Sequence, residues 1–246
     1  MYDSLSSYWQ FLRHPKLLKF SKNKLQLRSD FITLLILDYM IAFLVMGTLS
    51  ILLHYKLIKE YPLIDLTKRF GLLSAGFLIC VAAPFLEEGI FRYQLRKRTL
   101  SIYFLTISLA CIAISNTAND YLKIAIFISL FIIAVLCDTR FKSMPKVKSY
   151  LLWQKLYGWF FYLTAVIFAY VHLSNTKGLT VADPSFILYI LAQLVIGLSL
   201  GYLRIKYGLI YAILFHASYN GLLFLIMALG GAWDHTKALK LPDVAS

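Results

Sequence analysis

Seven long apolar runs, separated by short polar and basic segments, dominate the chain. They occupy residues 31–54, 71–95, 100–116, 121–137, 159–173, 186–203 and 209–231. A helix needs about 20 apolar residues to cross a hydrocarbon core about 30 Å thick. Most of the runs reach that length, and the third, fourth and fifth are shorter. The pattern predicts an all-α, polytopic bundle of about seven or eight membrane helices.

Residues 1–30 differ from the rest because Lys and Arg alternate there with aromatic residues and leucines. That mixture is typical of an amphipathic helix lying on a membrane surface, which Pro15 would kink or split. A solvated tail is the alternative. We therefore expect a basic amphipathic segment over 1–30 and a transmembrane domain over 31–246.

The composition supports a membrane protein, because 60% of the 246 residues are hydrophobic. The formal net charge of +13 does not predict nucleic-acid binding, since no soluble stretch is long enough to carry a binding module. Lys and Arg lie between the apolar runs, where they set topology. If the N-terminus is cytoplasmic, 17 of the 25 Lys and Arg fall in inside segments. The charge bias therefore predicts a cytoplasmic N-terminus, and seven crossings would put the C-terminus on the other side.

Two adjacent carboxylates and an arginine interrupt the second run: Glu87, Glu88 and Arg92. A charge at membrane depth costs several kcal/mol unless it is paired or faces water. Glu88 and Arg92 are four residues apart on a helix, so they share a face and can pair. Glu87 points about 100° away from Glu88. A purely structural ion pair explains Glu88 and Arg92 and leaves Glu87 unexplained, so we interpret Glu87 as a candidate for chemistry.

Two later runs also carry polar residues: His172 in the fifth, and His216 with Asn220 in the seventh. Alone, His172 could be an interfacial residue at the outer end of a short helix. His216 and Asn220 share one helix face, four residues apart. Three antiparallel segments thus bring carboxylate, imidazole and amide groups to similar depth.

This set of groups is suited to water activation. Glu87 can take the proton, while His172 or His216 positions the water or stabilises the developing oxyanion. Asn220 can donate to that oxyanion. The residues Glu87, His172 and His216 are also ligand types for Zn²⁺. The sequence leaves both chemistries open.

With these motifs placed, the chain resembles the CPBP intramembrane proteases, a family that includes CAAX prenyl endopeptidases and bacterial Abi proteins. The resemblance rests on three motifs in order, with a similar glycine-containing run, 197–204, ahead of the last: Glu87-Glu88-x-x-x-Arg92, Phe168-x-x-x-His172 and His216-x-x-x-Asn220.

The resemblance implies an endopeptidase of a bacterial inner membrane that cuts a protein or peptide substrate near the cytoplasmic face. By the same resemblance, Glu87 activates water, His172, His216 and Asn220 complete the site, and Glu88 and Arg92 support it. Metal-dependent and metal-free mechanisms are both compatible with the family. A lipid-modified substrate stays open.

One departure from the family is the separation of about 85 residues between Glu87 and His172. We interpret residues 100–137 as an inserted helical hairpin, which preserves orientation because two crossings cancel.

Two non-proteolytic functions compete with this hypothesis. Intramembrane Glu and His also serve as proton relays, so a proton-coupled transporter would show flux that depends on a pH gradient. A scaffold resembling a bacteriocin-immunity protein would keep its phenotype in Glu87→Ala and His216→Ala variants.

Overall fold

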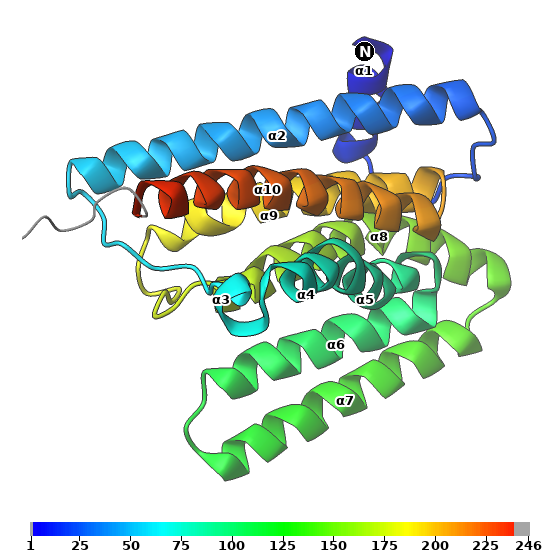
Figure 1. Cartoon of the computed structure of the whole chain (residues 1–246). Helices are drawn as coiled ribbons and strands as arrows, with labels where there is room; N and C mark the ends of the chain where they lie inside the picture. Colours follow the sequence, from blue (N-terminus) through cyan, green and yellow to red (C-terminus); the bar gives the residue numbers. More distant parts are fainter. Residues whose placement is uncertain (1, 239–246) are drawn as a thin grey trace, which may run out of the picture.

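The computed structural model describes residues 2–238, and their side chains up to Gly230, as helices joined by short connections (Figure 1). The remaining residues of the predicted 31–246 domain lie outside this described part. The elements are α1 (Tyr2–Arg13), α2 (Lys24–His54), α3 (Leu66–Phe70), α4 (Leu72–Phe77), the π-helix η1 (Leu78–Ala82), α5 (Ala83–Phe91), the 3₁₀ turn η2 (Tyr93–Arg96), α6 (Arg98–Ser115), α7 (Asp120–Ser143), α8 (Lys146–Val171), the 3₁₀ turn η3 (His172–Asn175), α9 (Phe186–Lys206) and α10 (Leu209–Ala238).

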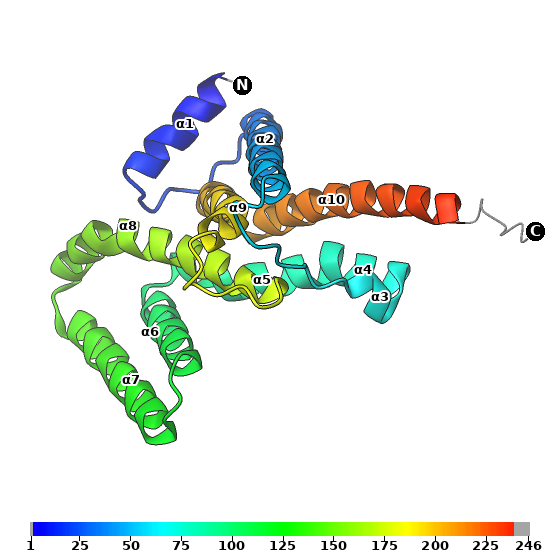
Figure 2. The same cartoon turned by 90° about the vertical axis from the view of Figure 1, so that its left-hand side faces the viewer.

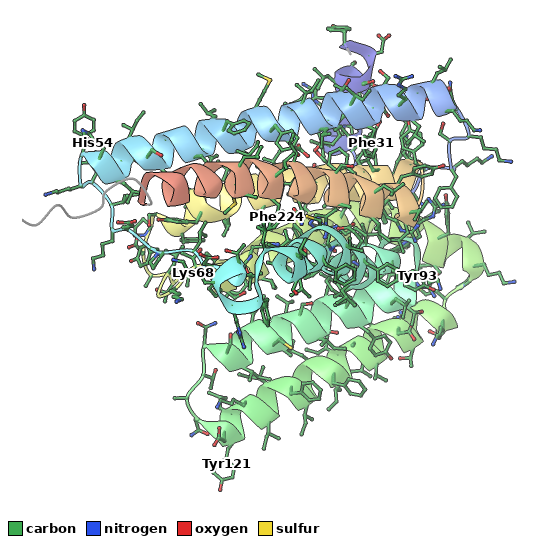
Figure 3. All side chains as sticks on the ribbon, viewed as in Figure 1. Phe31, His54, Lys68, Tyr93, Tyr121 and Phe224 are labelled. Carbon is green, nitrogen blue, oxygen red and sulfur yellow. The ribbon has the colours of Figure 1, made fainter. Side chains whose placement is uncertain are left out.

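Within the described residues, seven helical segments are long and apolar enough to cross a membrane. They are Lys24–His54, Leu72–Arg96, Arg98–Ser115, Asp120–Ser143, Lys146–Asn175, Phe186–Lys206 and Leu209–Gly230. Consecutive segments run in opposite directions (Figure 1). Phe31 and Tyr93 lie toward one end of the bundle, and His54, Lys68 and Tyr121 lie toward the other (Figure 3). The predicted all-α membrane bundle is confirmed.

Several helices extend well beyond the apolar runs that predict them. Helix α2 begins at Lys24, because the side chain of Asn23 accepts a hydrogen bond from the Gln26 amide at 3.1 Å and caps the helix. Helix α8 begins at Lys146, although its apolar run begins only at residue 159. Both extensions carry charged residues that interrupt the apolar run, so continuous apolar content alone does not reveal them.

The predicted N-terminal helix is present as α1, and it ends at Arg13, before Pro15. The apolar face of α1 packs against other helices of the bundle. The Phe11 ring lies 5.1 Å from the Phe161 ring of α8, and the Tyr8 hydroxyl is 3.2 Å from Ser199 Oγ of α9. Helix α1 therefore docks on the bundle through specific contacts.

The second membrane segment is helical as its apolar run predicts, but it is not a uniform α-helix. A π-helical turn, η1, separates α4 from α5, and a 3₁₀ turn follows α5. The Asn220 side-chain amide of α10 donates to the Ile79 carbonyl at 3.0 Å within that π-helical turn. A wide turn of this kind is a frequent feature near functional sites, and here it lies two turns before Glu87.

Helix α9 lies at the centre, with α2, α8 and α10 around it (Figure 2). Two glycines allow α8 to approach α9 closely. A Cβ atom at Gly201 would lie 2.6 Å from the Phe161 ring, and one at Gly197 would lie 3.2 Å from the Phe168 ring. Helices α6 and α7 pack against each other as an antiparallel hairpin that projects to one side (Figure 2). We continue to interpret this hairpin, predicted at 100–137, as an insertion.

We predict that Gly201→Ala destabilises the bundle by about 1–3 kcal/mol, because the added methyl overlaps a ring that cannot move freely. Phe161 is 1% exposed and packs against Phe11. The matched control is Gly47→Ala, since a Cβ atom at Gly47 meets nothing within 4 Å. Thermal unfolding of both variants in detergent tests this, and equal midpoints would contradict the close packing.

Candidate active site

Glu87 and Glu88 occupy different environments although they are neighbours in α5. The Glu88 side chain is 0% exposed and faces the bundle interior, whereas that of Glu87 is 28% exposed. The difference follows from the turn of about 100° between successive helical residues. One carboxylate is therefore enclosed by protein, and the other borders open space.

Glu88 is the centre of a buried polar cluster. Its Oε1 atom lies 3.0 Å from His216 Nδ1 and 3.4 Å from Arg92 Nη1. The Arg92 guanidinium is enclosed as well: it lies 3.9 Å from the centre of the Phe168 ring and donates to the Gly197 carbonyl at 3.4 Å. A buried charge is tolerated only when it is paired and hydrogen-bonded. Here Glu88 and Arg92 are paired and contact residues of α8, α9 and α10, while Glu88 Oε2 and Arg92 Nη1 have no hydrogen-bond partner among the described residues.

Glu87 faces both imidazoles. Its Oε2 atom lies 3.6 Å from His172 Nε2 and 3.8 Å from His216 Nε2. These separations are too long for direct hydrogen bonds and short enough for one bridging water. The same Oε2 atom is buried and has no hydrogen-bond partner among the described residues. The three groups named in the sequence analysis thus converge on one point.

The hydrogen bonds of the two histidines indicate which ring nitrogen carries the hydrogen and which one presents a lone pair to Glu87. His172 Nδ1 is 2.8 Å from the Phe168 carbonyl, which can only accept, so Nδ1 carries the hydrogen. His216 Nδ1 faces the Glu88 carboxylate in the same way. In the neutral rings, each Nε2 therefore presents a lone pair toward Glu87. The site is a cluster of acceptors, which suits the two hydrogens of a water molecule.

The zinc hypothesis can be tested against this geometry. Within the described residues, no group of three or more His, Cys, Asp and Glu side chains is arranged so that it could hold a metal ion. The set Glu87, His172 and His216 is thus not closed into a ligand shell. We derive no step through a metal.

Asn220 lies one helical turn beyond His216, and its amide nitrogen donates to the Ile79 carbonyl. No hydrogen bond joins it to Glu87, His172 or His216 in the described part of the chain. One of its two amide hydrogens is thus committed to the π-helical turn before α5. Oxyanion stabilisation by Asn220 stays a prediction, and the contact observed here is with the element that carries Glu87.

Comparison with known proteins identifies the family. Residues 69–222 match the family model described as Rce1-like, Type II CAAX prenyl endopeptidase Rce1-like. The match covers more than half of the chain and includes Glu87, His172 and His216. The chain belongs to the Rce1-like family. No curated protein and no solved structure matches it.

Membership of the Rce1-like family identifies the general class of this protein, which is that of the CAAX-type intramembrane endopeptidases. The seven helical segments in the described residues that are long and apolar enough to span a membrane agree with an integral membrane protein that acts on a protein or peptide substrate within a lipid bilayer.

Two buried carboxylates of α2 were not predicted from the sequence. Asp30 accepts hydrogen bonds from Lys206 at 2.8 Å and from Tyr207 at 2.7 Å. Asp38 accepts from Ser199 at 2.9 Å. Both join α2 to α9 or to the residue that follows it. The signal was available for Asp38, because an acidic residue in an apolar run is as costly in α2 as in α5. Asp30 lies directly before the predicted run 31–54 and carried no such signal.

We predict that Glu88→Ala lowers the free energy of unfolding by about 3–5 kcal/mol, because it leaves Arg92 buried without a counter-charge. Glu87→Ala should cost far less, since Glu87 is partly exposed and its Oε2 has no partner among the described residues. Denaturant unfolding in detergent compares the two variants. Equal losses would show that Glu88 is not the structural member of the pair.

Proposed function

We propose that this protein hydrolyses a peptide bond of a protein or peptide substrate near the cytoplasmic face of the membrane, with Glu87 as the general base. The observation that supports it most is the position of Glu87 Oε2, at 3.6 and 3.8 Å from the Nε2 atoms of His172 and His216. A carboxylate and an imidazole at one-water distance are what water activation requires.

In the proposed reaction, a water donates one hydrogen to Glu87 and the other to Nε2 of an imidazole. Its oxygen lone pair is then directed at the substrate carbonyl. As the oxygen–carbon bond forms, Glu87 takes the proton and the carbonyl becomes an oxyanion. When the carbon–nitrogen bond breaks, the proton passes from Glu87 to the leaving nitrogen. The second hydrogen of the water stays on the new carboxyl group, so the products are a carboxylic acid and an amine, and Glu87 is regenerated as a carboxylate.

Glu88 and Arg92 act in this proposal as positioning residues. Glu88 holds Nδ1 of His216 at 3.0 Å, which fixes the ring orientation and directs Nε2 toward Glu87. Arg92 neutralises Glu88, so that the carboxylate can remain charged inside the bundle. Asn220 is a further positioning residue, because its side-chain amide binds the π-helical turn before α5.

The membrane orientation that we propose rests on the positions of the basic segments. Those at 96–98, 140–148 and 204–206 flank the ends of α5, α7, α8 and α9 on the side where α2 begins. Positively charged connections favour the cytoplasm, so we assign this side of the bundle, and the N-terminus with it, to the cytoplasm. A bacterial inner membrane is the location that we expect from the resemblance.

Exposed apolar side chains adjoin the site on α5. Phe85, Leu86 and Ile90 are all exposed, on either side of Glu87 in sequence. In a bilayer these side chains face lipid. A substrate that is itself embedded in the bilayer, including a lipid-modified one, is compatible with this surface.

We predict that Glu87→Gln lowers the rate of cleavage by about 100- to 10,000-fold, because it removes the base and keeps the shape. His172→Ala and His216→Ala should fall in the same range. Membrane proteins that accumulate uncut in cells carrying Glu87→Gln identify the substrate. Its cleavage by the purified variants then gives the rates.

The matched control is Glu60→Gln, the same chemical change at an exposed loop position. Full activity of Glu87→Gln would contradict the mechanism. A phenotype unchanged in Glu87→Gln and His216→Ala would favour the scaffold. Solute flux driven by a pH gradient in proteoliposomes would favour the transporter.

Chelation tests the metal question separately. Because Glu87, His172 and His216 do not form a closed ligand set, we expect cleavage activity to survive treatment with a strong zinc chelator. Metal analysis of the purified protein accompanies the assay. Stoichiometric zinc, with activity lost on its removal and restored on its return, would contradict this expectation.

A further inference from the structure

An open cavity of about 640 Å³ lies between the end of α1 and the first half of α8, and none of the proposed catalytic residues lines it. The two helices approach each other there (Figure 2). The lining residues on which the argument depends are Arg13, His14, Lys16, Lys155, Trp159 and Tyr162.

The cavity is strongly basic. Arg13, Lys16 and Lys155 carry positive charge, and His14 adds a further cation when protonated. No Asp or Glu lines the cavity. Among the described residues, none of these three cations forms an ion pair with a carboxylate. Such a cluster complements an anion.

The position along α8 places the cavity at the membrane interface. Lys155 is the last charged residue of α8, and Trp159 follows one turn deeper with 70% exposure. Tryptophan is enriched at the level of lipid headgroups. Leu163 and Val166 continue the same exposed face into the hydrocarbon region at helical spacing. A headgroup held in the cavity would therefore have an apolar helix face directly beneath it.

The walls of the cavity are joined by contacts that do not involve a ligand. The Tyr162 hydroxyl donates to the Leu12 carbonyl at the end of α1. Pro15 packs close to Gly158, where an added Cβ atom would lie 3.7 Å from Pro15 Cδ. Protein contacts thus hold the cavity walls together, which lowers the entropic cost of ordering them on binding.

We propose that this cavity binds the headgroup of one anionic phospholipid, with its phosphate between Arg13, Lys16 and Lys155 and an acyl chain along Trp159, Leu163 and Val166. The site is independent of the proposed peptidase mechanism. Because the lipid would contact both α1 and α8, it would stabilise the docking of the N-terminal helix.

The test measures phosphatidylglycerol binding to the full chain in detergent by native mass spectrometry. The variant Arg13→Gln/Lys16→Gln/Lys155→Gln removes the three cations of the cavity. Because the cavity variant removes three charge-assisted contacts to one phosphate, we expect its phosphatidylglycerol binding to be at least about tenfold weaker. The matched control, Lys19→Gln/Lys22→Gln/Lys148→Gln, removes the same charge from exposed lysines of the flanking basic segments. It should bind phosphatidylglycerol like the unmodified protein.

Three results would overturn the proposal. The cavity and control variants could bind phosphatidylglycerol equally. The unmodified protein could bind zwitterionic phosphatidylcholine as tightly as phosphatidylglycerol. Millimolar inorganic phosphate at constant ionic strength could displace the lipid, which would indicate a site for free phosphate. Unfolding midpoints confirm that both triple variants are folded, so a loss of binding reports on the cavity.

Discussion

A carboxylate with no solvent exposure, held between membrane-embedded helices, is the constraint on which the rest of the structure depends. Glu88 must be paired, because an isolated charge at that depth costs several kcal/mol. Arg92 supplies the charge from the same segment, and His216 supplies a hydrogen bond from α10. Arg92 in turn contacts the Phe168 ring of α8 and the Gly197 carbonyl of α9. One buried pair therefore ties four helices together, and a side chain at Gly197 would crowd the Phe168 ring first and the Arg92 guanidinium next.

The contacts of Glu88 also help to orient the groups around the neighbouring carboxylate, Glu87. His216 connects the two, since its Nδ1 binds Glu88 while its Nε2 faces Glu87. His172 is oriented from the other side by the Phe168 carbonyl. Reactive groups are useful only when their supporting contacts hold them in place. Glu88 is thus committed to structural contacts, whereas Oε2 of Glu87 faces both imidazoles and has no hydrogen-bond partner among the described residues.

Part of this arrangement was predictable from sequence because its signals are local. Long apolar runs predict membrane helices, and Glu87, His172 and His216 stand out as costly residues within them. Other features depend on contacts between distant segments. Asp30 binds Lys206, which lies far along the chain, and one sequence does not reveal such pairs. The π-helical turn and the start of α8 at Lys146 were missed for similar reasons, because packing and polar helix ends leave little trace in apolar periodicity.

The most direct test is an experimental structure of the protein in a lipid environment, at a resolution that shows ordered water. The account predicts a water within about 2.6–3.2 Å of the Glu87 carboxylate and of Nε2 of His172 or His216. Glu87 turned toward lipid, or separated from both imidazoles by more than one water molecule, would contradict it.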